Sequence, residues 1–106
     1  MPKFVLAYHG SPQFESKEDG MDHMTAWKAW MHGLGDAVID PGHAVGPSHT
    51  IHADQSVTPD GGSNPLAGIT ILEADSIEAA IEMAKPCPHL SAGGTLEVAQ
   101  TLDMDM

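Results

Sequence analysis

The histidine at position 89 is the residue of this chain whose surroundings best suit acid–base chemistry. It lies in the segment Cys87-Pro88-His89-Leu90, after a helix-like segment and before the glycine pair Gly93-Gly94. An imidazole held by a proline at the end of an element titrates near neutral pH and can act as a general acid or base. The alternative is a structural histidine whose ring bonds nearby carbonyl groups and fixes the corner between a helix and a strand.

A second candidate catalytic residue, His23, is expected in the first turn of a helix. The positive end of the helix dipole there favours a neutral imidazole, which can accept a proton or bind a metal. Trp30, seven residues later, lies on the same flank and could wall a pocket of aromatic size. The alternatives are a partly exposed surface histidine and a tryptophan that belongs to the core or to an interface.

Two further residues are candidates for ligand binding. His9 directly follows a strand-like segment, and strand ends beside loops often carry sites. Asp60 is a possible carboxylate partner for an imidazole. The alternatives are a solvated loop histidine and an aspartate that stabilises a turn.

No metal site and no cofactor are predicted. His49 and His52 are three residues apart, and on a strand such residues point to opposite faces, so the pair should not chelate an ion together. With His43 added, no cysteine or carboxylate framework of zinc-like spacing appears. Cys87 is the single cysteine, so it cannot form an internal disulfide. We expect a small buried or structural thiol; the alternative is a nucleophile whose pKa is lowered by an imidazole.

The composition is strongly acidic. Fifteen Asp and Glu residues stand against four Lys and no Arg, and the net charge is −11 with neutral histidines. Such a surface repels phosphate backbones and acidic membranes, so neither nucleic acid nor a membrane is an expected partner. No apolar stretch approaches a membrane-spanning length, and the expected location is the cytoplasm.

Four strands are predicted from apolar runs and from β-branched residues. The runs at 4–8 and 66–72 are apolar on both faces, which is typical of strands covered on both sides. The four segments are 4–8, 48–53, 66–72 and 95–101. Residues 54–65 are predicted as an exposed connection, and residues 102–106 as an acidic tail.

Two helices are predicted from apolar residues at spacings of three and four. The first helix carries Met24, Trp27, Met31 and Leu34, with Asp19 or Asp22 as its cap. The second helix carries Ile77, Ala80, Ile81 and Ala84, with Asp75 as its cap, and it ends at Pro86.

This order of elements predicts one domain over residues 1–106, an α+β protein with a ferredoxin-like βαββαβ sandwich. Two helices can cover only one face of a four-stranded sheet. Because the strands at 4–8 and 66–72 are apolar on both faces, the other face needs a cover. A second copy of the chain is the economical answer, so we expect a homodimer with sheets packed face to face.

The chain resembles the YCII-related family, which includes the DGPF-type proteins, over nearly its whole length. The matching segments, in order, are Ala26-Trp27-Lys28-Ala29-Trp30-Met31, Leu34-Gly35, Leu72-Glu73-Ala74-Asp75-Ser76, Cys87-Pro88-His89-Leu90 and Gly93-Gly94-Thr95-Leu96-Glu97-Val98. Their order and spacing together carry the resemblance.

The resemblance implies a dimeric α/β barrel made of two ferredoxin-like units, with a pocket between sheet and helices. Some YCII-type proteins pair a histidine on a helix with an aspartate, and His23 could match that histidine. Here Cys87-Pro88-His89 occupies the turn where the family carries the aspartate, and Pro59-Asp60-Gly61-Gly62-Ser63 stands near the place of the DGPF signature.

These observations lead to a small homodimer that binds a modest organic molecule. If the protein is an enzyme, His89 or His23 would move protons in a cofactor-free lyase, isomerase or dehalogenase-type step on a cyclic or aromatic substrate. One alternative is a non-enzymatic ligand-binding or interaction module. A third is a relative of the dimeric-barrel monooxygenases.

Overall fold

The computed structural model describes residues 1–103, so the end of the tail predicted at 102–106 lies outside the described residues. Six strands, three α-helices and one 3-10 helix form in this part of the chain. In chain order the elements are β1 (Lys3–His9), α1 (Lys17–Leu34), η1 (Gly35–Ala37), β2 (Val38–Ala44), β3 (Thr50–Ile51), β4 (Val57–Thr58), β5 (Leu66–Glu73), α2 (Ile77–Ala84), α3 (Pro88–Ser91) and β6 (Thr95–Gln100).

The main sheet has four antiparallel strands in the order β2-β5-β1-β6. The central strand β1 pairs Val5 with Ile71 of β5 on one side and with Ala99 of β6 on the other. The predicted α+β class is therefore confirmed, and this strand order is compatible with a ferredoxin-like fold.

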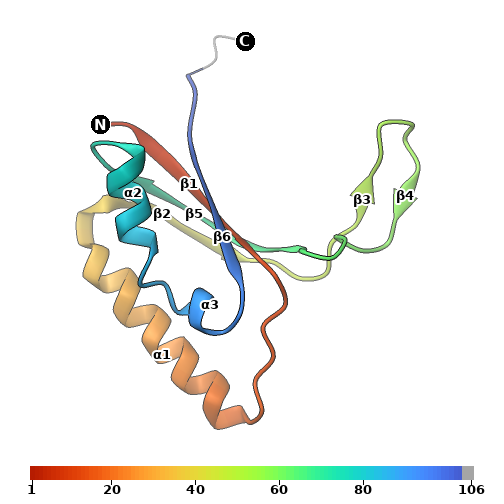
Figure 1. Cartoon of the computed structure of the whole chain (residues 1–106), viewed down its shortest axis with the longest axis horizontal. Helices are drawn as coiled ribbons and strands as arrows, with labels where there is room; N and C mark the ends of the chain where they lie inside the picture. Colours follow the sequence, from red (N-terminus) through yellow and green to blue (C-terminus); the bar gives the residue numbers. More distant parts are fainter. Residues whose placement is uncertain (104–106) are drawn as a thin grey trace.

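The second strand of the sheet is not the predicted segment 48–53. The sheet uses β2, which includes Asp40-Pro41-Gly42, a sequence that reads locally as a turn. Proline is tolerated here because β2 is an edge strand. Only Thr50–Ile51 of the predicted segment is a strand, and it pairs with β4 in a separate two-stranded sheet that extends away from the body (Figure 1).

Serine side chains, not the predicted aspartates, cap both longer helices. Ser16 accepts a hydrogen bond from the backbone N–H of Asp19 at 3.1 Å, and α1 begins at Lys17. Ser76 accepts one from the N–H of Ala79 at 3.1 Å, and α2 begins at Ile77. A serine oxygen satisfies a free N–H of the first turn as well as a carboxylate does.

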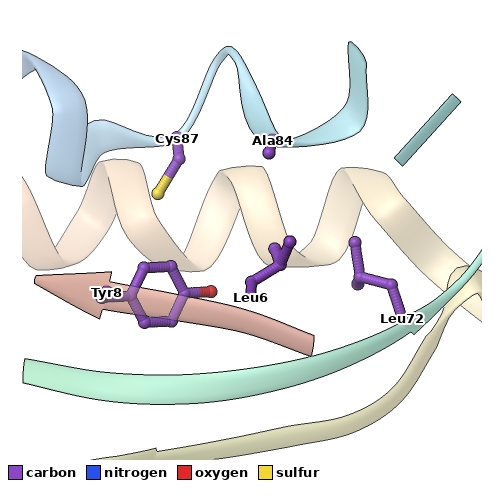
Figure 2. Close-up of a cluster of buried hydrophobic side chains, with 5 residues drawn as sticks. All are labelled: Leu6, Tyr8, Leu72, Ala84 and Cys87. Carbon is purple, nitrogen blue, oxygen red and sulfur yellow. The ribbon is translucent and has the colours of Figure 1, made fainter. Parts of the chain in front are cut away.

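The core lies between the helices and one face of the sheet. Figure 2 shows Leu6, Tyr8 and Leu72 rising from the strands toward Ala84 and Cys87 of the segment above them. All five are buried. A second cluster joins Phe4 to Ala74 and Ala80.

The opposite face of the sheet carries an apolar strip on β1 and β5, with Glu97 and Asp40 on the flanking strands, and is covered by no element among residues 1–103. Alternation along the strands places Val5, Ala7 and Ile71 on this face, because their neighbours point into the core. Ile69 lies beside Ala7 there and is 40% exposed.

Candidate functional site

A cavity of about 450 Å³ lies between α1 and the β2–β5 edge of the sheet. Volumes of this size are typical of small-molecule sites. Its walls come from β1, the β1–α1 loop, α1, β2, β5 and α3. The lining residues are Tyr8, Pro12, Phe14, His23, Met24, Trp27, Lys28, Met31, Pro41, Gly42, His43, Ala44, Ala67, Gly68, Ile69, Thr70 and His89.

One stripe of α1 supplies the helical wall. His23, Trp27 and Met31 follow one another at intervals of four residues, so they lie one above another on the same side of the helix. The rings of His23 and Trp27 are 5.7 Å apart between centroids. On the other side of His23, Phe14 from the loop lies 4.9 Å away. An aromatic row therefore borders the cavity.

His89 reaches the same cavity from α3. Its ring is 6.1 Å from the ring of Trp27 and 5.7 Å from that of Tyr8. The two predicted catalytic histidines, His23 and His89, therefore both lie close to Trp27 in one cavity. Their proximity depends on the packing of α3 against α1.

The orientation of His89 is set by a backbone acceptor. Its side chain is only 4% exposed, and Nε2 donates a hydrogen bond to the carbonyl oxygen of His9 at 2.7 Å. A carbonyl only accepts, so the proton of the neutral ring sits on Nε2. Nδ1 has no hydrogen-bond partner among residues 1–103 and keeps its lone pair.

Gly94 makes room for this ring. A Cβ atom at position 94 would overlap Nε2 and its two neighbouring ring carbons. The glycine at this position is therefore required by the imidazole, which packs directly on the backbone at the start of β6.

The sheet side of the cavity contains a chain of hydroxyl groups. The Tyr8 hydroxyl donates to Thr70 Oγ1 at 2.7 Å, and the Thr70 hydroxyl donates to the carbonyl of Pro41 at 3.0 Å. Burial raises the pKa of Tyr8 to about 12, although the hydrogen bond to Thr70 partly opposes the shift. Both hydroxyl protons are thus committed within the protein, and only oxygen lone pairs remain for a ligand.

A bulge in β2 shapes the edge of the cavity. The pairing with β5 shifts between Asp40 and His43, where Gly42 has φ +72°. A Cβ atom on Gly42 would run into the carbonyl oxygen of Ile69, so only glycine fits this close approach. At this bulge the carbonyl of Pro41 accepts the hydrogen bond from Thr70, and His43 lies at the cavity.

The pKa of His23 is lowered, for a different reason from the predicted one. Because α1 begins at Lys17, His23 lies beyond the first turn, and the prediction of a first-turn position was wrong. Burial lowers the pKa, and the nearby charge of His89 lowers it further. Both causes favour a neutral imidazole at neutral pH.

Three of the predicted site residues lie away from this cavity. The ring of His9 contacts Glu97 Oε1 and the carbonyl of Asn64, each at 3.2 Å, so only the backbone of His9 serves the site. Trp30 donates its ring N–H to the carbonyl of Met83 at 3.0 Å and packs against the core. Asp60 accepts the N–H of Gly62 at 2.9 Å in a turn near the hairpin.

Cys87 is a buried thiol, 2% exposed. Burial raises its pKa to about 11, so the neutral thiol prevails at neutral pH. No group of three or more potential metal ligands gathers among residues 1–103. His52 donates to or accepts from the hydroxyl of Thr58 at 2.6 Å, within the hairpin.

The cavity residues that were not predicted as site residues include Tyr8, Phe14, Trp27, Lys28 and Thr70. Trp27 carried a usable signal, because it stands four residues after His23. Lys28 follows Trp27 directly on the same helix. Tyr8, Phe14 and Thr70 reach the cavity only through contacts between distant segments, which no local pattern indicates.

No family model matches the chain, and no match was found among curated proteins. Among the described residues, no helix is both long enough and apolar enough to cross a membrane.

Proposed function

We propose that this protein binds a small organic molecule in the cavity beside Trp27, and that His89 and His23 move protons on the bound molecule. The observation that carries the proposal is the convergence of two imidazoles on one largely apolar cavity. Both rings lie within about 6 Å of Trp27, at 5.7 and 6.1 Å. Aromatic walls favour a cyclic or aromatic substrate.

His89 is the better general base. Its Nε2–H is held by the carbonyl of His9 at 2.7 Å, which leaves Nδ1 to accept a proton. Such a backbone hydrogen bond fixes the tautomer and stabilises the imidazolium that forms. His23, with its lowered pKa, is a second neutral imidazole that can relay or return a proton.

The reaction class that fits is cofactor-free proton transfer at carbon. Nδ1 removes a proton from a C–H bond beside a carbonyl group, and the electron pair moves into the carbonyl to give an enolate. In an isomerisation the same proton returns to a different atom of the substrate. In a lyase or dehalogenase-type elimination, the leaving group departs instead with its bonding electron pair.

A second candidate is a non-enzymatic binding module. The observation that favours it is that none of the described acidic residues lines the cavity to orient or charge-stabilise an imidazole. In enzymes that use histidine as a base, a carboxylate often plays this part. In the alternative, His89 serves only to fix the corner between α3 and β6.

Deuterium exchange separates the two candidates without knowledge of the reaction. Cyclic ketones and small aromatic compounds are first screened for binding by thermal shift. Compounds that bind are then incubated with the protein in heavy water, and loss of C–H signals is followed by proton NMR. We expect exchange that falls by at least about 100-fold in His89→Ala, the usual scale for losing a general base.

The matched control is His32→Ala, because His32 is an exposed histidine on α1 that does not line the cavity. The His32→Ala variant should catalyse deuterium exchange as fast as the wild type. Binding without exchange would leave the binding module as the function. Absence of binding across the screen, or full exchange in both His89→Ala and His23→Ala, would overturn the proposal.

We also propose that two copies pack sheet against sheet, as the YCII-related dimeric barrels do, and that the chain is a member of that family. The support is the uncovered apolar strip, where Val5 pairs with Ile71 and Ala7 with Ile69. Lys3 stands opposite Glu73 in the strand register at the margin of this strip, and charged residues suit an interface rim. A stable dimer buries about 800 Å² on each partner, and the sheet is the apolar face available for it.

A further inference from the structure

The cavity lining contains no acidic residue of the described part of the chain, although the chain as a whole is strongly acidic. The chain has fifteen acidic residues and four lysines. None of the acidic residues among 1–103 lines the cavity, whereas Lys28, His23, His43 and His89 do. Any ligand therefore meets a lysine and imidazoles inside a protein that is otherwise strongly anionic.

Lys28 is free to bind a ligand. It makes no ion pair with any residue in the described range, whereas Lys85 is paired with Glu82 at 2.7 Å. Asp40 is the acidic residue adjoining the lining segment of β2, and its carboxylate accepts the N–H of Gly42 at 2.8 Å. That carboxylate is thus engaged in its own turn.

The hydroxyl groups on the sheet side cannot replace Lys28 as partners of an anion. Tyr8 donates its proton to Thr70, and Thr70 donates to Pro41, so both present lone pairs. A negative group placed beside these lone pairs would be repelled. The attractive partner for an anion is therefore on the helix side, and the rings of Tyr8, Phe14 and Trp27 remain for the apolar body of the ligand.

We propose that the ligand of this cavity is an anionic aromatic molecule, a flat ring system with a carboxylate or phenolate held by Lys28. This inference rests on the proposed binding function and names its ligand class. The ring packs against the aromatic row of α1 and the β1–α1 loop, and the anionic group lies at Lys28. The neutral imidazoles then face the ring or the substituent beside it.

Three naphthalene probes of nearly equal shape test the charge preference: 2-naphthoate, 2-naphthamide and 2-(aminomethyl)naphthalene. Binding is measured by quenching of tryptophan fluorescence at about pH 8, where histidine is ordinarily neutral. We expect 2-naphthoate to bind about tenfold more tightly than either other probe at low salt. The preference should shrink as salt is added, because a partly exposed charge pair is screened.

Lys28→Met assigns the preference to one residue. In this variant the three dissociation constants should come within about twofold of one another, with the amide bound as in the wild type. Lys17→Met is the matched control, because Lys17 is on the same helix, carries the same charge and does not line the cavity. It should keep the tenfold preference.

The outcomes separate the two levels of the proposal. Equal binding of all three probes, or a preference that survives Lys28→Met, overturns the anionic ligand while the binding function stands. Failure of all three probes to bind overturns the ligand class, and failure of the wider compound screen as well overturns the binding function.

Discussion

His89 Nε2 lies 2.7 Å from the carbonyl oxygen of His9, although the two residues are 80 positions apart in the chain. This bond joins the end of β1 to α3 and decides which ring nitrogen carries the proton. The site therefore depends on backbone geometry at one corner of the sheet, where His9 pairs with Thr95.

Gly94→Ala should disturb this corner. The added methyl group would overlap the imidazole of His89, so we expect a loss of about 1–3 kcal/mol in the free energy of unfolding, typical of overpacking. Urea denaturation of the wild type and the variant measures this loss in the free energy of unfolding. In a His89→Ala background the ring is absent, and the same substitution should cost much less.

Gly33→Ala is the control for Gly94→Ala. A Cβ at Gly33 meets nothing within 4 Å, and the residue is inside α1. It should raise stability by roughly 0.5–1 kcal/mol through helix propensity. Equal costs of Gly94→Ala with and without His89 would contradict the packing of the ring on Gly94.

Tyr8 should make stability sensitive to alkaline pH. Because burial raises its pKa from 10.0 to about 12, its contribution is fully present below pH 10 and is lost as the pH rises through about 12. Tyr8 is the single tyrosine, so tyrosinate absorbance reports it alone. We expect a midpoint near 12 in the folded protein, and Tyr8→Phe should lose less stability over this range. A native midpoint at the unperturbed value would contradict the burial of the Tyr8 hydroxyl group.

Cys87 should be almost inert toward thiol reagents in the native state. Its pKa is raised from 9.0 to about 11 by burial. At about pH 8 this shift alone lowers the thiolate fraction, and hence the rate, by about 100-fold relative to the unfolded chain. Colour release from an aromatic disulfide, with and without urea, gives the ratio. Comparable rates in the two states would show that the thiol is accessible.

His23 should titrate below the usual histidine range and respond to His89. Its pKa is lowered by burial and by the charge of His89. The stability that His23 lends the fold is therefore present above pH 6.5 and falls as the pH drops below 6.5, because the unfolded chain then binds the proton more strongly. NMR titration of His89→Ala should give a higher His23 pKa than the wild type. The control is His49→Ala, in the region before β3, which should leave the pKa of His23 unchanged. A pKa of His23 that shifts in His49→Ala but not in His89→Ala would contradict the coupling.

Ile71→Lys should convert the proposed dimer into monomers. The lysine would place a charge on the uncovered face of the sheet, opposite Val5 of β1. Light scattering measures the mass, and circular dichroism checks the fold. Ile51→Lys is the control, since Ile51 is 73% exposed on the hairpin and lies outside the main sheet. A wild-type protein that is monomeric at working concentration would contradict the dimer.

The elements were predictable wherever the signal was local. The run at residues 4–8, the apolar spacing in α1 and α2, and the β-branched segment of β5 all led to the observed elements. The strand β2 was missed because Pro41 and Gly42 are turn residues in most contexts, and only the pairing with β5 makes them an edge strand with a bulge. The aspartate caps were wrong by a few residues, because several residues able to cap stand close together.

The sequence alone determined that this chain forms a mixed α+β domain, and it indicated His23 and His89 as candidate catalytic residues beside three candidate ligand-binding residues. Their spacing, their neighbours and the proline and glycine residues beside them are local properties. Only the tertiary structure decided that both histidines share a cavity with Tyr8, Trp27 and Lys28, and that His9, Trp30 and Asp60 do not line it. The physical reason is that a cavity is made by contacts between segments far apart in the chain, and those contacts depend on how α1 and α3 pack on the sheet.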